Sequence, residues 1–315
     1  MAIYVDDGLA VSSSNKDLKE PIMKIQEKFQ IKITPGDAYV GIEIMRDKRG
    51  IYITQTKLIK EVLEKLSMME AKPGSVPMQQ NLHLIRGEKN GCQFPYQELS
   101  RSHLFIARIS RPDIAFAVAK LSQFNTCYDG THVSATKLVL CYLRGTFGFG
   151  LLLPATGSIV LQGFTDADYA ADRTDRKSQS EFAFYIRDAL VSWKSAKQNV
   201  VSTSSCESEY IAVYEGVNEA IWLISILQQF GFIKKELTSI YCDSTSAINL
   251  SINLNGAHKQ TKHIEVKYHL NWEAQSKAIV DLQQVRTEDQ RADIFTKPLQ
   301  PARFKKMRKE LGVTG

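Results

Sequence analysis

The chain has 315 residues, 43% hydrophobic and 23% charged, and its formal net charge at pH 7 is +6. These values exclude a disordered or fibrous chain, and the length allows two domains of ordinary size. No apolar run reaches the roughly 18 residues of a membrane span, no secretory signal opens the chain, and the cysteines form no CxxC pair. We therefore expect an intracellular protein, cytoplasmic or nuclear, without disulfides or a zinc site, whose mild positive charge suits a polyanionic partner.

The N-terminal stretch MAIYVDDGLA contains two adjacent carboxylates, Asp6 and Asp7, between apolar flanks. Two like charges in such a setting are costly unless a cation is present. The stretch therefore predicts a metal-binding hairpin.

The rest of the first half alternates short strands with helices. Alternating apolar residues predict strands at Tyr39–Met45 and Ile51–Thr54, and an apolar stripe predicts a helix over Lys57–Leu66. The prolines and glycine of EAKPGSVPM then mark a boundary near residue 75. Beyond it, Pro112 at a helix start and the segment His132–Leu143 predict two further helices.

After residue 155 the pattern becomes strand-rich. Successive strands separated by polar turns are expected at Ile159–Thr165, Phe182–Arg187 and Leu190–Ser195. A long helix follows from about Cys206 to Phe230, with a capping box of Ser204 and Glu207. A strand through TSIYCD, a helical stretch, a strand at Ile279–Val285 and a final helix complete the series. This order predicts a mixed α/β fold in which helices pack on one sheet.

Four carboxylic acids fall at the ends of these expected elements: Asp166, Glu209, Asp243 and Asp293. Strand ends and helix starts can converge on one spot, where four anions need divalent cations to coexist. Two-metal sites use such a cluster to hydrolyse phosphodiesters, and Mg²⁺ suits hard oxygen ligands. Each acid taken singly is also explained as a turn residue or as an acid at a helix N-terminus.

Several long motifs give the chain a family resemblance. GFTDADYAADRTDRKSQS, SWKSAKQNVVSTSSCESEYIA, IYCDSTSAI, TKHIEVKYH and EDQRADIFTKPL follow one another as in copia-type retrotransposon polyproteins, and they resemble the terminal ribonuclease H domain. The upstream pieces YVDD, YVGIEIMRD, RPDIAFAV and YLRGT resemble the last part of the reverse transcriptase of the same polyprotein. The resemblance implies a ribonuclease H-like mixed five-stranded sheet with helices, preceded by a truncated palm and thumb remnant.

The same resemblance divides the chain into consecutive parts. These are a truncated palm remnant with the YVDD box at 1–75, a thumb- or connection-like helical region at 76–155, a ribonuclease H-like domain at 156–300 and a basic helix at 301–315. The basic helix is open to two explanations, phosphate contact or simple solvation.

The resemblance also implies the site. It places the acid quartet of the family on Asp166, Glu209, Asp243 and Asp293, as catalytic residues and as ligands of two Mg²⁺ ions, with Mn²⁺ as the alternative. His263 and His269 fall near the expected active-site side and can assist product release, while a solvent-facing histidine is the simpler explanation.

The YVDD box becomes, by resemblance, the remnant of a polymerase metal site formed by Asp6 and Asp7. A polymerase palm also needs an earlier aspartate and the fingers, and only three residues precede Tyr4. We therefore expect no polymerase activity from this chain alone.

The chain departs from the family at a few positions. Gln179 stands where relatives have threonine, and Glu181 stands where they have glycine. The charged side chain of Glu181 can disturb the second strand. Arg101 and His103 replace a usual glycine and leucine upstream, which suggests relaxed packing.

Three functional hypotheses follow. The first is an endonuclease that cuts the RNA strand of RNA–DNA hybrids with two metal ions and recognises RNA by its 2′-hydroxyls. The second is a catalytically inactive relic that binds a hybrid or another nucleic acid duplex. The third is an unstable fragment whose upstream half exposes sheet edges. The complete quartet favours the first; the sequence leaves the oligomeric state open.

Overall fold

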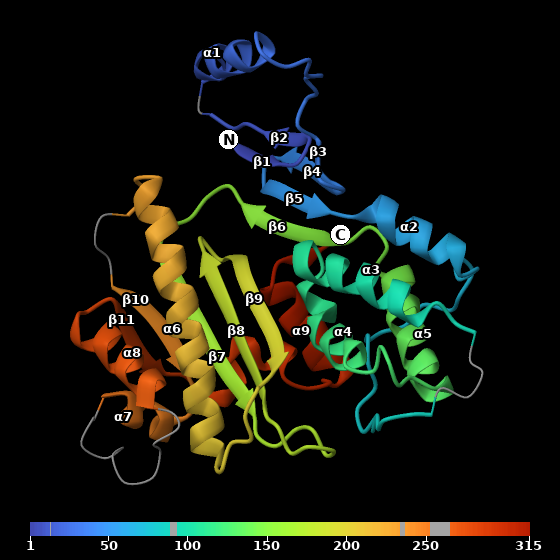
Figure 1. The fold of residues 1–315 in the computed structure, drawn as a ribbon, viewed down its shortest axis with the longest axis vertical. Coiled ribbons are helices and arrows are strands. Elements are labelled where there is room, and N and C mark those ends of the chain that lie inside the picture. Colours follow the sequence, from blue (N-terminus) through green and yellow to red (C-terminus); the bar gives the residue numbers. More distant parts are fainter. Residues whose placement is uncertain (13, 89–92, 234–236, 253–264) are drawn as a thin grey trace.

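A computed structural model describes residues 1–315 except 13, 89–92, 234–236 and 253–264 (Figure 1). The described strands form two five-stranded sheets and a small hairpin. The hairpin pairs β1 (Ala2–Tyr4) with β2 (Asp7–Leu9) and is followed by helix α1 (Asn15–Gln26). These first elements lie at one end of the molecule, beyond the upstream sheet (Figure 1).

The upstream sheet is antiparallel and has the order β12-β6-β5-β4-β3. Its strands are β3 (Ala38–Tyr39), β4 (Ile42–Asp47), β5 (Gly50–Thr54), β6 (Gly150–Pro154) and β12 (Val313–Thr314). The single strand predicted over Tyr39–Met45 is wrong, because Val40 and Gly41 adopt positive φ angles of 47° and 73° and turn the chain between β3 and β4.

The helices of the upstream region lie at one side of the molecule, beside the second sheet (Figure 1). They are α2 (Thr56–Lys65), α3 (Tyr96–Ile109), the short 3₁₀ helix η1 (Pro112–Ile114), α4 (Ala115–Ser122) and α5 (Gly130–Gly145). The helices predicted over Lys57–Leu66 and His132–Leu143 are present, whereas the pattern did not predict α3. Pro112 begins the 3₁₀ turn that leads into α4.

The second sheet has the order β11-β10-β7-β8-β9. Its strands are β7 (Leu161–Asp168), β8 (Gln179–Ile186), β9 (Ala189–Lys197), β10 (Thr238–Cys242) and β11 (Val280–Gln284). β7, β8 and β9 are antiparallel neighbours, and β10 and β11 run parallel to β7. This is the mixed five-stranded, ribonuclease H-like sheet that the resemblance implied, so the predicted fold class is confirmed.

The long helix α6 (Ser205–Gln229) crosses one face of this sheet (Figure 1). Gly216 permits the close approach, because a Cβ there would lie 2.4 Å from Thr165 Cγ2 on β7. The helix is long and apolar enough to cross a membrane, but half of its most apolar window is buried. It packs on β7, β8, α7 (Thr245–Ile252) and α8 (Glu265–Ser276), which makes it a core helix.

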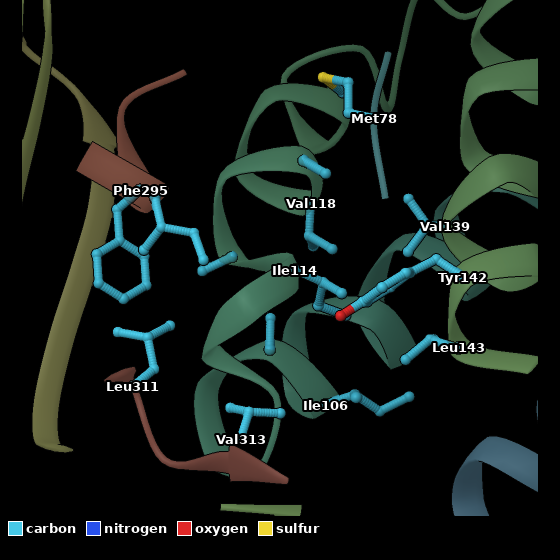
Figure 2. Packing of buried hydrophobic residues seen from close by; sticks show 14 of the residues in the cluster. Met78, Ile106, Ile114, Val118, Val139, Tyr142, Leu143, Phe295, Leu311 and Val313 are labelled. Carbon is cyan, nitrogen blue, oxygen red and sulfur yellow. The ribbon is translucent and has the colours of Figure 1, made fainter. Parts of the chain in front are cut away.

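The opposite face of the sheet shares a core with the upstream helices. Figure 2 shows Phe295, Leu311 and Val313 facing Ile114 and Val118 of the upstream region. The core therefore continues across the boundary expected at residue 155, and the four-part division of the chain stays a prediction.

Helix α9 (Pro301–Glu310) follows the second sheet and packs into this shared core. Its Phe304, Met307 and Arg308 are buried, and Arg308 Nη1 donates to Tyr142 Oη at 3.2 Å. One face of this basic helix is therefore buried in the core. Phosphate contact and simple solvation, the two explanations considered for the helix, do not apply to that face.

Candidate active site

The four predicted acids come from four separate elements. Asp166 lies in the second half of β7, Glu209 in the first turns of α6, and Asp243 directly after β10. Asp293 lies in the 3₁₀ helix η5 (Arg291–Phe295) rather than in the longer helix that the sequence predicted. Pro298 stops this turn from continuing as an α-helix.

The structure brings these acids into one cluster. One carboxylate oxygen each of Glu209 and Asp243 lies within 4.8 Å of the other and of Cys242 Sγ. The charges of Asp243 and Asp293 act on Asp166, and those of Asp166 and Asp243 act on Glu209. The convergence that the sequence suggested is therefore present.

Two threonines support the carboxylates. Thr296 Oγ1 lies within hydrogen-bond distance of both Asp166 Oδ2 (3.2 Å) and the Asp293 carbonyl oxygen (2.7 Å). Thr287 Oγ1 donates to Asp243 Oδ2 at 3.1 Å. These contacts hold the acids in place from the segment that joins β11 to α9.

Burial and mutual repulsion perturb the acids. Burial, followed by the charges of Asp293 and Asp243, raises the pKa of Asp166 well above its usual range. Burial, followed by Asp166 and Asp243, does the same to the pKa of Glu209. Asp166 and Glu209 therefore resist ionisation while their neighbours are charged. Acids in such a cluster favour a cation, and perturbed carboxylates are typical of functional sites.

Two cations border the cluster on one side. Lys297 Nζ lies 2.8 Å from Asp293 Oδ1, and Arg303 of α9 contacts Asp293 Oδ2. Arg303 Nη2 also donates to the carbonyl oxygen of Thr287 at 3.3 Å. The sequence analysis missed both residues. The spacing of four residues between Asp293 and Lys297 was a usable signal for an ion pair, whereas nothing local pointed to Arg303.

Glu181 is a fifth acid at the cluster. It pairs with Asp166 across β7 and β8, is 1% exposed, and leaves the run of β8 unbroken. The strand disturbance considered for this residue is therefore absent. Its two carboxylate oxygens have no hydrogen-bond partner among the described residues. Burial, with the charges of Asp166, Asp168 and Glu209 next, raises its pKa well above the usual range.

Gln179 is also accommodated, since its Nε2 donates to Ser195 Oγ at 3.1 Å.

The other predicted residues lie elsewhere. Asp6 and Asp7 are exposed on the N-terminal hairpin, and in the part of the chain that the structure describes no third ligand forms a cluster with them. His269 is exposed on α8. His263 lies outside the described residues.

The ligand set of the cluster fits a hard divalent cation. Its carboxylate oxygens are the donors that Mg²⁺ and Mn²⁺ prefer. Burial, with the charge of Glu209 next, raises the pKa of Cys242, so that its sulfur remains a neutral thiol and a weak ligand. Asp166, Glu209, Asp243 and Asp293 can therefore hold such ions, with Cys242 as packing.

Comparisons with known proteins identify the family of the chain. The family described as "Reverse transcriptase (RNA-dependent DNA polymerase)" matches residues 1–80. The Pol polyprotein from transposon TNT 1-94 of Nicotiana tabacum is 34% identical over 99% of this chain and 24% of its own length. That from transposon RE1 of Arabidopsis thaliana is 33% identical over 100% of this chain and 22% of its own length.

Two solved structures show weaker likeness. LC11-RNase H1, solved in complex with an RNA/DNA hybrid, is 15% identical over 42% of this chain and 91% of its own, with a TM-score of 0.30. The foamy viral protease–reverse transcriptase in complex with double-stranded DNA is 10% identical over 86% of this chain and 43% of its own, with a TM-score of 0.46. The fold assignment rests on the strand order.

The fold and the acid cluster define a protein of the ribonuclease H-like class. The chain belongs to the family of copia-type retrotransposon Pol polyproteins. It spans about a quarter of the length of the curated relatives it matches.

Proposed function

We propose that the chain is a divalent-metal endonuclease that cuts the RNA strand of RNA–DNA hybrids and leaves a 3′-hydroxyl and a 5′-phosphate. The observation that carries the proposal is the convergence of Asp166, Glu209, Asp243 and Asp293 from four elements, with raised pKa values at Asp166 and Glu209. A purely structural cluster gains nothing from gathering four acids with two cations at its edge.

The residues of the chain have separate tasks in this proposal. The four acids hold two Mg²⁺ or Mn²⁺ ions, which when bound activate water and stabilise the leaving oxygen. Thr287 and Thr296 orient the carboxylates through the hydrogen bonds described above. The family match supports this substrate class, because an RNA-dependent DNA polymerase makes DNA paired with RNA. Contacts to 2′-hydroxyls across the minor groove then select RNA.

The test is cleavage of an end-labelled RNA–DNA hybrid in Mg²⁺ by the full chain and by Asp243→Asn. This substitution keeps the size of the side chain and removes a charge that the ions need. We expect its loss of activity to exceed the about 10- to 100-fold typical of losing a second-shell partner of a metal ligand. The matched control is Asp281→Asn, because Asp281 lies on the neighbouring strand β11, opposite Ser239 and away from the cluster. Equal activity of Asp243→Asn and the parent would disprove the assignment.

One observation favours the alternative, a nucleic-acid binder without catalysis. Glu181 adds a fifth acid beside Asp166, and a site with surplus buried charge can bind its ions in an unproductive arrangement. The same assay decides between the two functions when hybrid binding is measured by fluorescence anisotropy. Folded parent protein that binds the hybrid without cutting it supports the alternative, and Glu181→Gly would then restore cleavage if Glu181 is the cause.

A further inference from the structure

Lys297 places a positive charge at the edge of the carboxylate cluster. Its Nζ lies 2.8 Å from Asp293 Oδ1, and the Asp293 side chain is only 2% exposed. The backbone that precedes Lys297 is fixed, since Phe295 is fully buried and Thr296 contacts Asp166 and Asp293. The ammonium is therefore held at the acids by its own anchored segment.

The charge of Lys297 acts on more than its direct partner. It favours the ionised forms of Asp166, Asp168 and Glu209 as well as pairing with Asp293. In a part of the molecule where burial and repulsion oppose ionisation, this ammonium supplies the compensation that a divalent cation supplies in a metal site.

The ammonium of Lys297 is also able to move away from Asp293 into solvent. Its side chain is 45% exposed, and a lysine is a point charge on a flexible stem that can turn into solvent. Arg303 differs, because its guanidinium is held by Asp293 and by a second hydrogen bond to the carbonyl oxygen of Thr287. Of these two cations, Lys297 is therefore the one that an incoming ion displaces.

We propose that Lys297 is the internal counter-ion of the metal-free carboxylate cluster, and that a divalent cation must displace its ammonium from Asp293 in order to bind. This proposal rests on the metal site of the proposed function, and it adds that the Lys297 ammonium and the divalent cation compete for Asp293. Metal affinity is then set by the four acids and also by the cost of releasing Lys297.

The first test measures the affinity of the full chain for Mn²⁺ without nucleic acid, with the unbound ion counted by electron paramagnetic resonance. Lys297→Met removes the competing charge, and we expect it to lower the Kd about three- to tenfold, as removal of one half-exposed unit charge beside a divalent site should. Lys297→Arg keeps the charge and should bind Mn²⁺ like the parent.

The matched control is Lys306→Met. Lys306 lies on α9, is 68% exposed, and pairs with Glu310 at 3.7 Å, away from the acids. This variant should leave the Kd unchanged. An unchanged or higher Kd in Lys297→Met would overturn the inference while leaving the metal site intact. Folded parent protein that binds no Mn²⁺ would overturn the proposed function, and the inference with it.

A second test needs no substitution and covers the case in which Lys297→Met does not fold. Lysines of the parent are acylated for a short time with and without Mg²⁺, and the products are quantified by mass spectrometry. Mg²⁺ should raise the reactivity of Lys297 relative to Lys306, because release from Asp293 exposes the amine. Equal reactivity under both conditions, at Mg²⁺ concentrations that shift the melting temperature, would refute displacement.

Discussion

Two clusters of buried charge lie in this molecule, and they are built in opposite ways. In the upstream core, Arg111 and Asp113 are both fully buried and form a bidentate pair at 3.0 and 2.8 Å. Tyr142 donates to the same aspartate, and Arg111 also donates to the hydroxyl of Thr146 at 2.7 Å. Every charge there has an opposite charge or a hydrogen bond of its own.

The acid cluster beside α6 lacks this balance. Four carboxylates and Glu181 face the two border cations, Lys297 and Arg303. Burial of charge alone therefore does not indicate function. A paired cluster holds the fold together, whereas a cluster with surplus charge of one sign needs a partner that the protein does not contain.

The largest effect is expected from breaking the paired cluster. Asp113→Asn removes the negative partner and leaves the buried Arg111 uncompensated, which should lower the free energy of unfolding by about 3–5 kcal/mol. Urea denaturation followed by circular dichroism measures the change. Glu273→Gln is the control, because the Glu273–Lys277 pair is exposed and screened by solvent, so its loss should leave the unfolding curve nearly unchanged. An equally small loss of unfolding free energy in Asp113→Asn would mean that the charges of the upstream cluster do not stabilise the fold.

The next effect concerns the ion that the acid cluster is expected to need. Mg²⁺ at a hundred times its Kd should raise the free energy of unfolding of the parent by about 2.7 kcal/mol. Asp166→Asn should lose most of this gain, while Asp113→Asn should keep it despite its lower stability. Thermal melts with and without Mg²⁺, with EDTA as the reference, measure both. The same gain in Asp166→Asn and in the parent would place the ion elsewhere.

Removal of one acid from the metal-free cluster should raise the stability of the protein, whereas Asp113→Asn should lower it. Without metal, Asp166→Asn relieves repulsion in the acid cluster, so it should stabilise the protein by about 1–2 kcal/mol, the size typical of removing an unfavourable charge arrangement. Urea denaturation in EDTA gives the value. Destabilisation of more than about 1 kcal/mol would show that the cluster is balanced after all, and would refute the contrast with Arg111 and Asp113.

The sequence predicted the acid cluster because its members lie at the ends of strongly patterned elements. β7, β10 and α6 have clear apolar periodicity, so the positions of Asp166, Asp243 and Glu209 followed from them. Arg303 could not be predicted in this way. It reaches Asp293 only because α9 folds back onto the upstream core, and this docking depends on residues far apart in the chain.

Local conformation accounts for the other differences. The turn at Val40 and Gly41 interrupts an alternating apolar pattern that reads as one strand, and only the positive φ angles reveal it. Glu181 was expected to disturb β8 because a charged side chain replaces glycine. Propensity gave the wrong expectation there, because the strand is fixed by pairing with β7 and β9 on both sides.

The smallest change in stability is expected at His103, a buried polar side chain of the upstream region. It lies in the upstream core at 2% exposure, and among the described residues its Nε2 has no hydrogen-bond partner. It is thus an unpaired polar group like Glu181, but no cluster of acids or other ligands surrounds it in the described structure. It should therefore carry only a structural cost, and His103→Leu should stabilise the protein by about 1 kcal/mol at pH 7.

The pH dependence separates this cost from a change in packing. Burial lowers the pKa of His103 from its ordinary value of 6.5 to about 3. The folded protein therefore keeps the ring neutral while the unfolded chain takes up a proton below pH 6.5, so this stability is complete above 6.5 and is lost as the pH falls toward 3. At pH 5.5 the parent should have lost about 1.3 kcal/mol relative to His103→Leu beyond the difference at pH 7. Parallel stability curves between pH 7 and 5 would mean that His103 takes up its proton equally well in the folded and unfolded states, so that burial does not lower its pKa.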